Sequence, residues 1–205
     1  MRSLDWGLQL PVRALTNAGA GFGAGYAIGG LVPGLVVGGI LLGLGIVHGV
    51  ALAIKRAYAW NSAGGWFLFI VDNTWSLLNS IAGSVYGLIN FLMFNPLSDQ
   101  GVGTGAVFHK RPFIPGFAAT TVGNVVAGDN AATAEHELIH VLQGRIFGPL
   151  YIPLVILSYI VNTLLPYWLI YHDYRRAPIN SVGAYFIEGV YRHTWNEEWA
   201  YKVAG

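Results

Sequence analysis

The chain has 205 residues, of which 54% are hydrophobic and 10% are charged, and its mean hydropathy is +0.51. A soluble domain usually carries about a quarter charged residues, so this composition indicates contact with lipid. The formal net charge of +1 argues against a nucleic-acid partner. Because there is no cysteine, the chain has no disulfide and no thiolate metal site, and any metal must be held by histidines and carboxylates.

The first long apolar segment covers residues 14–54, and none of these 41 residues is charged. This is about twice the roughly 20 residues that one helical span needs. Pro33-Gly34, near the middle, favours a turn, so we expect a hairpin of two spans at about 15–32 and 35–54; one long kinked helix is the alternative. Arg13 and Lys55-Arg56 then flank the hairpin on one side, which the positive-inside rule makes cytoplasmic. The residues before it lack the apolar centre of a signal peptide, so the hairpin is expected to remain as an anchor.

The glycines of this hairpin recur every four residues. The series are Gly21, Gly25 and Gly29; Gly30, Gly34 and Gly38; Gly39 and Gly43; and Gly45 and Gly49. On a helix this spacing, a glycine zipper, makes a groove in which another backbone can approach closely. One interpretation is internal packing of the hairpin; the other is contact with a second subunit, in a homo-oligomer or with another membrane protein. His48, alone on an apolar span, is expected to be packed or hydrogen-bonded.

Residues 66–94 form a third apolar segment, which we expect to be a membrane helix. It is more polar than a helix exposed to lipid should be, because it contains Asp72, Asn73, Asn79, Ser80 and Asn90. Bare polar groups are costly in hydrocarbon, so these side chains are expected to face protein or a wet cavity. Residues 95–130 then contain β-compatible runs broken by Pro and Gly, which predict one or two short strands.

The stretch "TAEHELIHVLQ", residues 133–143, carries the sequence pattern HExxH. A helix is predicted from about Ala131 to Phe147, begun by the capping residues of "GDNAAT" and ended by Gly148-Pro149. On that helix His136 and His140 share one face and can both point a ring nitrogen at one zinc ion. Glu137 lies close enough to contact a metal-bound water and act as its general base.

A third protein ligand is needed, and the candidates downstream are Glu188, His193, Glu197 and Glu198. In "WNEEWAY", Asn-Glu followed by Ala resembles the third-ligand helix of gluzincins, zinc peptidases whose third ligand is a glutamate. This resemblance favours Glu197, with Glu198 as the alternative. His193 or Tyr201 is expected to stabilise the oxyanion.

The stretch "HELIHVLQGRIFGPLYIP" resembles an uncharacterised group of bacterial membrane-associated zincin-like proteins. The matching residues are His136, Glu137, His140, Gln143, Gly148, Pro149 and Leu150. "NTWSLLNSIAGSVYGL" and "TTVGNVVAG" are also similar, so the resemblance covers about residues 70–205. The group has a terminal Asn-Pro-x-Glu-x-Glu-Ala motif, and this chain departs from it, since no Pro follows Asn196 and Trp199 replaces the second Glu. By the same resemblance, the strand around 118–126 is expected to hold a substrate as an added β-strand.

Residues 149–172 pose a geometric problem for this site. As one helix they would span roughly 34 Å and carry Glu197 to the other side of the membrane from the histidines. The interruptions at Asn162-Thr163 and Pro166 favour instead a bent or re-entrant segment, followed by an amphipathic tail.

The sequence thus predicts a mainly α membrane protein with a small α+β zincin-like unit. We expect a glycine-rich hairpin at 1–65, a third membrane helix and loop at 66–100, and the zincin-like unit at 101–205. Its predicted function is that of a zinc metallopeptidase in the bacterial inner membrane, acting on peptides. The alternative is a non-catalytic subunit of a larger membrane complex, with the zincin-like unit as scaffold and the glycines for docking.

Overall fold

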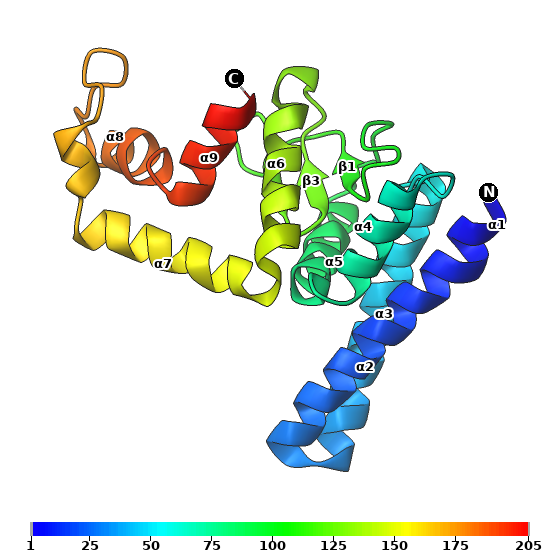
Figure 1. Cartoon of the computed structure of the whole chain (residues 1–205). Coiled ribbons are helices and arrows are strands. Elements are labelled where there is room, and N and C mark those ends of the chain that lie inside the picture. The colour runs from blue at the N-terminus through cyan, green and yellow to red at the C-terminus, as the bar shows by residue number, and fades with distance from the viewer. Residues whose placement is uncertain (1, 205) are drawn as a thin grey trace. The chain divides into compact units, whose positions relative to one another are not determined.

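The computed structural model describes residues 2–204 and is mainly helical, with one small sheet (Figure 1). The chain folds as two compact units, Met1–Pro149 and Leu150–Gly205, where the sequence suggested three parts. In the first unit the elements are α1 (Arg2–Leu4), η1 (Asp5–Gln9), α2 (Leu10–Gly29), α3 (Leu31–Lys55), α4 (Ala63–Asn73), α5 (Leu77–Leu92), β1 (Val107–His109), β2 (Thr120–Val122), β3 (Val125–Ala127), α6 (Ala131–Phe147) and the 3₁₀ turn η2 (Gly148–Leu150), which straddles the boundary.

Helices α2 and α3 form the expected antiparallel hairpin, drawn in blue in Figure 1. The turn is at Gly30, whose φ of +81° suits a residue without a side chain. The prediction that Pro33-Gly34 makes the turn is therefore wrong. Pro33 lies in the first turn of α3, where a helix tolerates proline because the amide has no intrahelical acceptor there.

Some of the hairpin glycines lie where the two helices touch. A Cβ added at Gly21 would come within 2.8 Å of the Val37 carbonyl oxygen, and one at Gly45 within 2.8 Å of the Arg13 carbonyl oxygen. Four other glycines of the same helices would place a Cβ with no heavy atom within 4 Å: Gly19, Gly23, Gly39 and Gly43. The glycines therefore fall into two sets. The inner set lies at the contact between α2 and α3 and lets the two backbones approach, and the outer set lies away from this contact.

The third apolar segment is two helices, α4 and α5, where the sequence predicted one. The Asn73 amide donates to the Phe69 carbonyl oxygen at 2.8 Å, and the Thr74 hydroxyl donates to that of Ile70 at 2.7 Å. Such side chains compete for backbone acceptors at the end of a helix and favour a break. With 11 and 16 residues, neither helix matches the roughly 20 residues of a full span.

The polar side chains of these helices face protein, as expected. Asp72 is buried, and the Arg145 guanidinium donates to both of its carboxylate oxygens, at 2.8 and 2.7 Å. The Tyr58 hydroxyl also donates to Asp72, at 2.9 Å, and the Arg13 guanidinium donates to the Asp72 backbone oxygen at 3.0 Å. His48 is likewise hydrogen-bonded, with Nε2 3.1 Å from Asn124 Oδ1.

The sheet has the order β1-β3-β2, with β1 parallel and β2 antiparallel to β3. Gly123 and Asn124 form the two-residue connection between β2 and β3. The φ of Gly123 is +60°, a conformation that such tight hairpins need. This topology leaves β2 on an edge of the sheet.

Two helical stretches are long and apolar enough to cross a membrane, by length and composition: Leu31–Lys55 and Ala131–Leu164. The second runs through α6, η2 and α7 (Tyr151–Leu164). This agrees with the membrane association that the composition indicates.

The second unit contains α7, the 3₁₀ turn η3 (Tyr167–Ile170), α8 (Val182–Ala184), the π-helical turn η4 (Tyr185–Tyr191) and α9 (Trp195–Ala204). Helix α7 ends at Leu164, so the apolar segment is interrupted just before Pro166. Trp168 is fully buried, its ring contacts His193 and Tyr185, and its indole N–H donates to the Asn162 carbonyl oxygen at 2.9 Å. This tryptophan is the centre of the unit's small core.

Candidate metal centre

The HExxH residues lie on α6, whose bounds are those expected from the sequence. The Asn130 side chain accepts a hydrogen bond from the Ala132 backbone N–H at 3.0 Å and caps the helix start. Gly148 ends the helix with a φ of +54°. These two local signals place the motif entirely within the helix.

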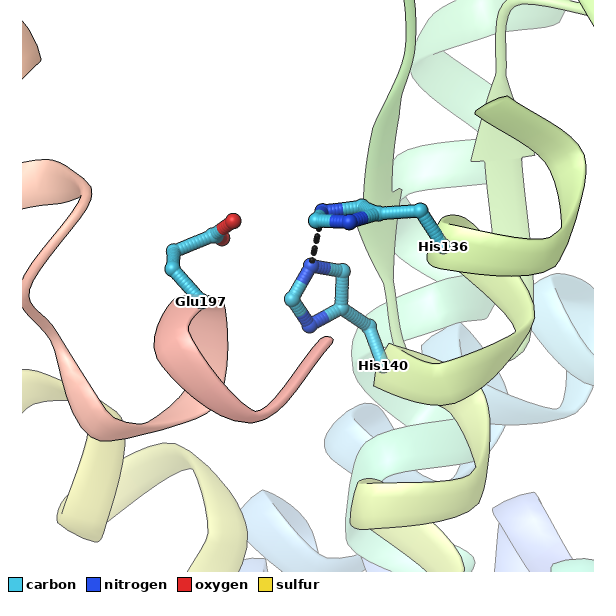
Figure 2. Close-up of side chains that lie close together, drawn as sticks. All are labelled: His136, His140 and Glu197. Atoms are coloured by element: carbon cyan, nitrogen blue, oxygen red, sulfur yellow. Dashed lines mark hydrogen bonds between the residues drawn. The ribbon is translucent and has the colours of Figure 1, made fainter. Parts of the chain in front are cut away.

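His136 and His140 face each other one turn apart on α6 (Figure 2). Their Nε2 atoms are 3.2 Å apart, and the ring planes meet at 82°. His140 is buried and His136 is partly exposed. Both histidines therefore direct the same ring nitrogen toward one point.

Gln143 fixes the orientation and the tautomer of His140. Its side-chain oxygen lies 3.1 Å from His140 Nδ1, and its side chain is fully buried. An amide oxygen can only accept a hydrogen bond, so Nδ1 carries the ring proton. His140 Nε2 is then the atom that presents a lone pair, as a metal-binding histidine requires.

Glu137 is buried and linked to the edge strand of the sheet. The Thr121 hydroxyl, in the middle of β2, donates to Glu137 Oε2 at 2.5 Å. The strand that the sequence singled out as a substrate edge thus lies against the helix that carries the histidines. Val122 on this strand is exposed, so this part of β2 is not covered within the described residues.

The C-terminal half of α6 is fastened to the rest of the first unit. The Ser76 hydroxyl and the Asn79 amide donate to the Gly144 carbonyl oxygen, at 3.0 and 2.9 Å, and Asn79 also donates to that of Gly148 at 2.7 Å. The Gly144 carbonyl oxygen also accepts the Gly148 backbone N–H, whereas Asn79 gives the Gly148 carbonyl, at the helix end, a hydrogen-bond partner. Together with the ion pair of Arg145 and Asp72, they fix the helix that carries His136 and His140.

In the second unit, Glu197 is a buried carboxylate in the first turn of α9, and it is the third residue drawn in Figure 2. Tyr191 hydrogen-bonds to this carboxylate, and the pKa of the Tyr191 phenol is raised, first by burial and then by the charge of Glu197. The Asn196 amide donates to Glu197 Oε1 at 3.3 Å. The second unit therefore holds Glu197 in a defined position.

Glu198, the alternative third ligand, has different contacts from those of Glu197. It accepts a hydrogen bond from the Tyr171 hydroxyl at 3.1 Å and lies 3.4 Å from His193 Nδ1 and 3.5 Å from Lys202 Nζ. Neighbouring residues of a helix point about 100° apart, so these contacts direct Glu198 away from the direction of Glu197. Glu188, a further candidate, pairs with Arg192 one turn later.

His193 lies in the same cluster as Glu198. Its Nε2 is 2.9 Å from His172 Nδ1, and burial lowers its pKa although Glu198 acts in the opposite direction. The ring of Tyr201 lies under the Arg192 guanidinium, 5.8 Å from its centroid. The oxyanion role of His193 or Tyr201 stays a prediction.

Thr121 and Tyr191 were not identified from the sequence as parts of the site. Nothing near Thr121 in the chain signals its contact with Glu137, because the two residues meet only when the sheet packs on α6. For Tyr191, the signal available was the density of tyrosines in the amphipathic tail, which does not single out one residue.

No protein-family model, curated protein or solved structure matches this chain. The interpretation of this site as a metal centre therefore depends on the geometry of this chain's own residues.

Proposed function

We propose that His136, His140 and Glu197 bind one zinc ion and that the chain is a membrane-associated zinc metallopeptidase. Each of the three residues offers one ligand atom, two imidazole nitrogens and a carboxylate oxygen. Without cysteine in the chain, this is the donor set available to zinc. Glu197 comes from the second unit, so its part in the site is tested separately from that of the histidines.

The observation that carries the proposal is the geometry of the histidine pair. Two nitrogens that are each about 2.05 Å from a tetrahedral zinc ion lie about 3.3 Å apart. The Nε2 atoms of His136 and His140 are 3.2 Å apart, and Gln143 leaves the Nε2 lone pair of His140 pointing outward. The pair thus fits the spacing and the tautomer that one shared ion requires.

Zinc would supply positive charge that polarises a peptide carbonyl and acidifies a water molecule. Glu137 takes a proton from the attacking water as the new carbon–oxygen bond forms. The same carboxyl then returns that proton to the leaving amine as the carbon–nitrogen bond breaks. Thr121 orients Glu137 for this transfer and couples it to the strand beside which an extended peptide would lie.

Metal analysis of the purified protein tests the ligand assignment. We expect one zinc per chain in the unchanged protein and none in the double variant His136→Ala, His140→Ala. Glu197→Gln should weaken zinc binding strongly, whereas the matched variant Glu198→Gln should leave it unchanged. Stoichiometric zinc in the double histidine variant would exclude the proposed zinc site. Equal effects of the two glutamate changes would exclude Glu197 as the third ligand.

Glu137→Gln separates the peptidase from a purely structural zinc site. The amide is of the same size but cannot accept the proton, so turnover of a peptide library should fall by about 10²–10⁴-fold. Zinc content should not change, because Glu137 acts on the water. A library cleaved equally well by the variant would exclude Glu137 as the base.

A second function is favoured by the outer glycines of the hairpin. Gly19, Gly23, Gly39 and Gly43 face away from the α2–α3 contact and would admit another backbone, as a docking subunit of a membrane complex requires. The change Gly23→Ile with Gly39→Ile should then abolish co-purification of a fixed partner or of a second copy. Constant partners, lost in this variant, together with no cleavage of any peptide, favour the docking subunit over the peptidase.

The proposed location is the bacterial inner membrane, with the hairpin as an integral anchor. The protein should stay in the membrane fraction after a carbonate wash and need detergent for extraction. Release by carbonate would show peripheral association only.

A further inference from the structure

The second unit contains a cavity of about 620 Å³ whose lining includes none of His136, His140 and Glu197. It is lined by residues of α9 and of the segments that follow η3 and η4, all of which belong to this unit. Its volume is in the range of about 300–1,000 Å³ that is typical of small-molecule sites.

Basic side chains outnumber acidic ones in the lining of the cavity. Arg176, Arg192 and Lys202 line it, against the two carboxylates of Asp173 and Glu198. Both carboxylates already have partners. Asp173 accepts hydrogen bonds from the backbone N–H groups of Arg175 and Arg176, at 3.0 and 3.2 Å, and Glu198 contacts the Tyr171 hydroxyl and Lys202.

Arg176 is the basic residue whose charge is not matched. Within the described residues its guanidinium makes no ion pair and no side-chain hydrogen bond, and its side chain is exposed at the cavity. The turn formed by Asp173 fixes the backbone that carries it. The three basic side chains of the lining outnumber its two carboxylates, so the lining carries an excess of positive charge, and the complementary ligand is an anion. A phosphate group suits arginine, whose planar guanidinium donates two parallel hydrogen bonds to it.

The surroundings of the cavity indicate where such an anion comes from. Apolar side chains of the segment that leads into the lining at Tyr171 are exposed: Ile170 by 90%, Leu164 by 71% and Leu165 by 67%. Tyr167, Tyr171 and Tyr174 are exposed on the same short segment. Tyrosines beside arginines and aliphatic side chains are typical of the interface between a bilayer and water.

We propose that this cavity binds the phosphate of an anionic phospholipid headgroup, with Arg176 as its principal contact and the residues around Ile170 in the adjoining acyl layer. The ligand is held by Arg176, with Arg192 and Lys202 as secondary charges. Their own partners, Glu188 and Glu198, are at least partly exposed, so these ion pairs are weak and can rearrange. The site is separate from the zinc ligands and does not depend on the peptidase activity.

The test uses the full chain purified in detergent and short-chain phosphatidylglycerol, with bound lipid counted by native mass spectrometry. Saturable binding of one lipid is expected, with none for phosphatidylcholine of the same chain length. Arg176→Gln should weaken the binding by about tenfold or more, as expected on losing a charge-assisted contact. The matched control is Arg175→Gln, which changes the neighbouring arginine, a residue that does not line the cavity.

Three results would overturn the proposal. Equal binding of both lipids would mean that the acyl chains alone are recognised. Equal effects of Arg175→Gln and Arg176→Gln would mean a general attraction to positive charge. Displacement of the lipid by inorganic phosphate, or by an acidic peptide, at concentrations at which the lipid binds would assign the cavity to a soluble anion. Circular dichroism of Arg176→Gln should match that of the unchanged protein, so that lost binding reports on the contact.

Discussion

The two compact units of this chain stabilise their elements by different means. The first unit buries many polar side chains and pairs them across long sequence distances, as with Asp72 and Arg145 or Asn79 and Gly148. The second unit buries few apolar side chains in its described part, among them Trp168, Val190 and Ala200. Its apolar helix α7 has Asn162 as its buried residue. The histidines of the candidate site therefore lie on a fixed support, whereas Glu197 depends on a small core.

Removing Asp72 should have the largest effect on the first unit. Asp72→Ala leaves the buried guanidinium of Arg145 without its counter-charge, and breaking such a pair typically costs about 3–5 kcal/mol. Thermal unfolding in detergent measures the loss. The control is Asp99→Ala. Asp99 also forms an ion pair, with Lys55, but it is fully exposed, so no change in stability is expected. A small effect of Asp72→Ala would mean that the polar network does not support α6.

Trp168→Ala should act on the second unit alone. Removing a fully buried tryptophan costs about 3 kcal/mol, the lower end of the usual range, because a small and exposed unit can collapse around the gap. Amide exchange should become faster in residues 150–204 and stay unchanged in α5 and α6. Leu164→Ala, at an exposed position of the same unit, is the control. Faster exchange throughout the first unit would show that the two cores are not independent.

Gln143→Ala should have a smaller effect, confined to the metal. The buried amide of Gln143 holds His140, and loss of such a partner typically weakens metal binding by about 10–100-fold. This corresponds to about 1.4–2.7 kcal/mol. A zinc titration against a competing chelator measures it, with the exposed neighbour Leu142→Ala as control. Unchanged affinity would mean that Gln143 does not set the tautomer of His140.

The sequence was most informative where the signals are local. The bounds of α6 were predicted correctly, because Asn130 and Gly148-Pro149 act within a few residues of the helix ends. The hairpin turn was misplaced, because Pro33 looks like a turn residue although the first turn of a helix accommodates it. The contact of Thr121 with Glu137 could not be predicted from the sequence, since it depends on how the sheet packs against α6.

The part of the hairpin that extends past α5 is shorter than the thickness of a bilayer. Asn17 of α2 donates to the Ser84 hydroxyl of α5 at 3.4 Å, so α5 still covers the hairpin at this level. From Ala18 to Gly29 the helix advances only about 18 Å, against about 30 Å of hydrocarbon in a bilayer. A bilayer crossed by this hairpin therefore also surrounds part of α5, whose outer side chains Leu78, Val85 and Leu92 are exposed and apolar. In such a bilayer α5 would set the depth of immersion, and Asn17 and Ser84 would lie below the lipid surface, where the Ser84 hydroxyl accepts from Asn17 and itself donates to the Ser80 carbonyl oxygen at 2.8 Å.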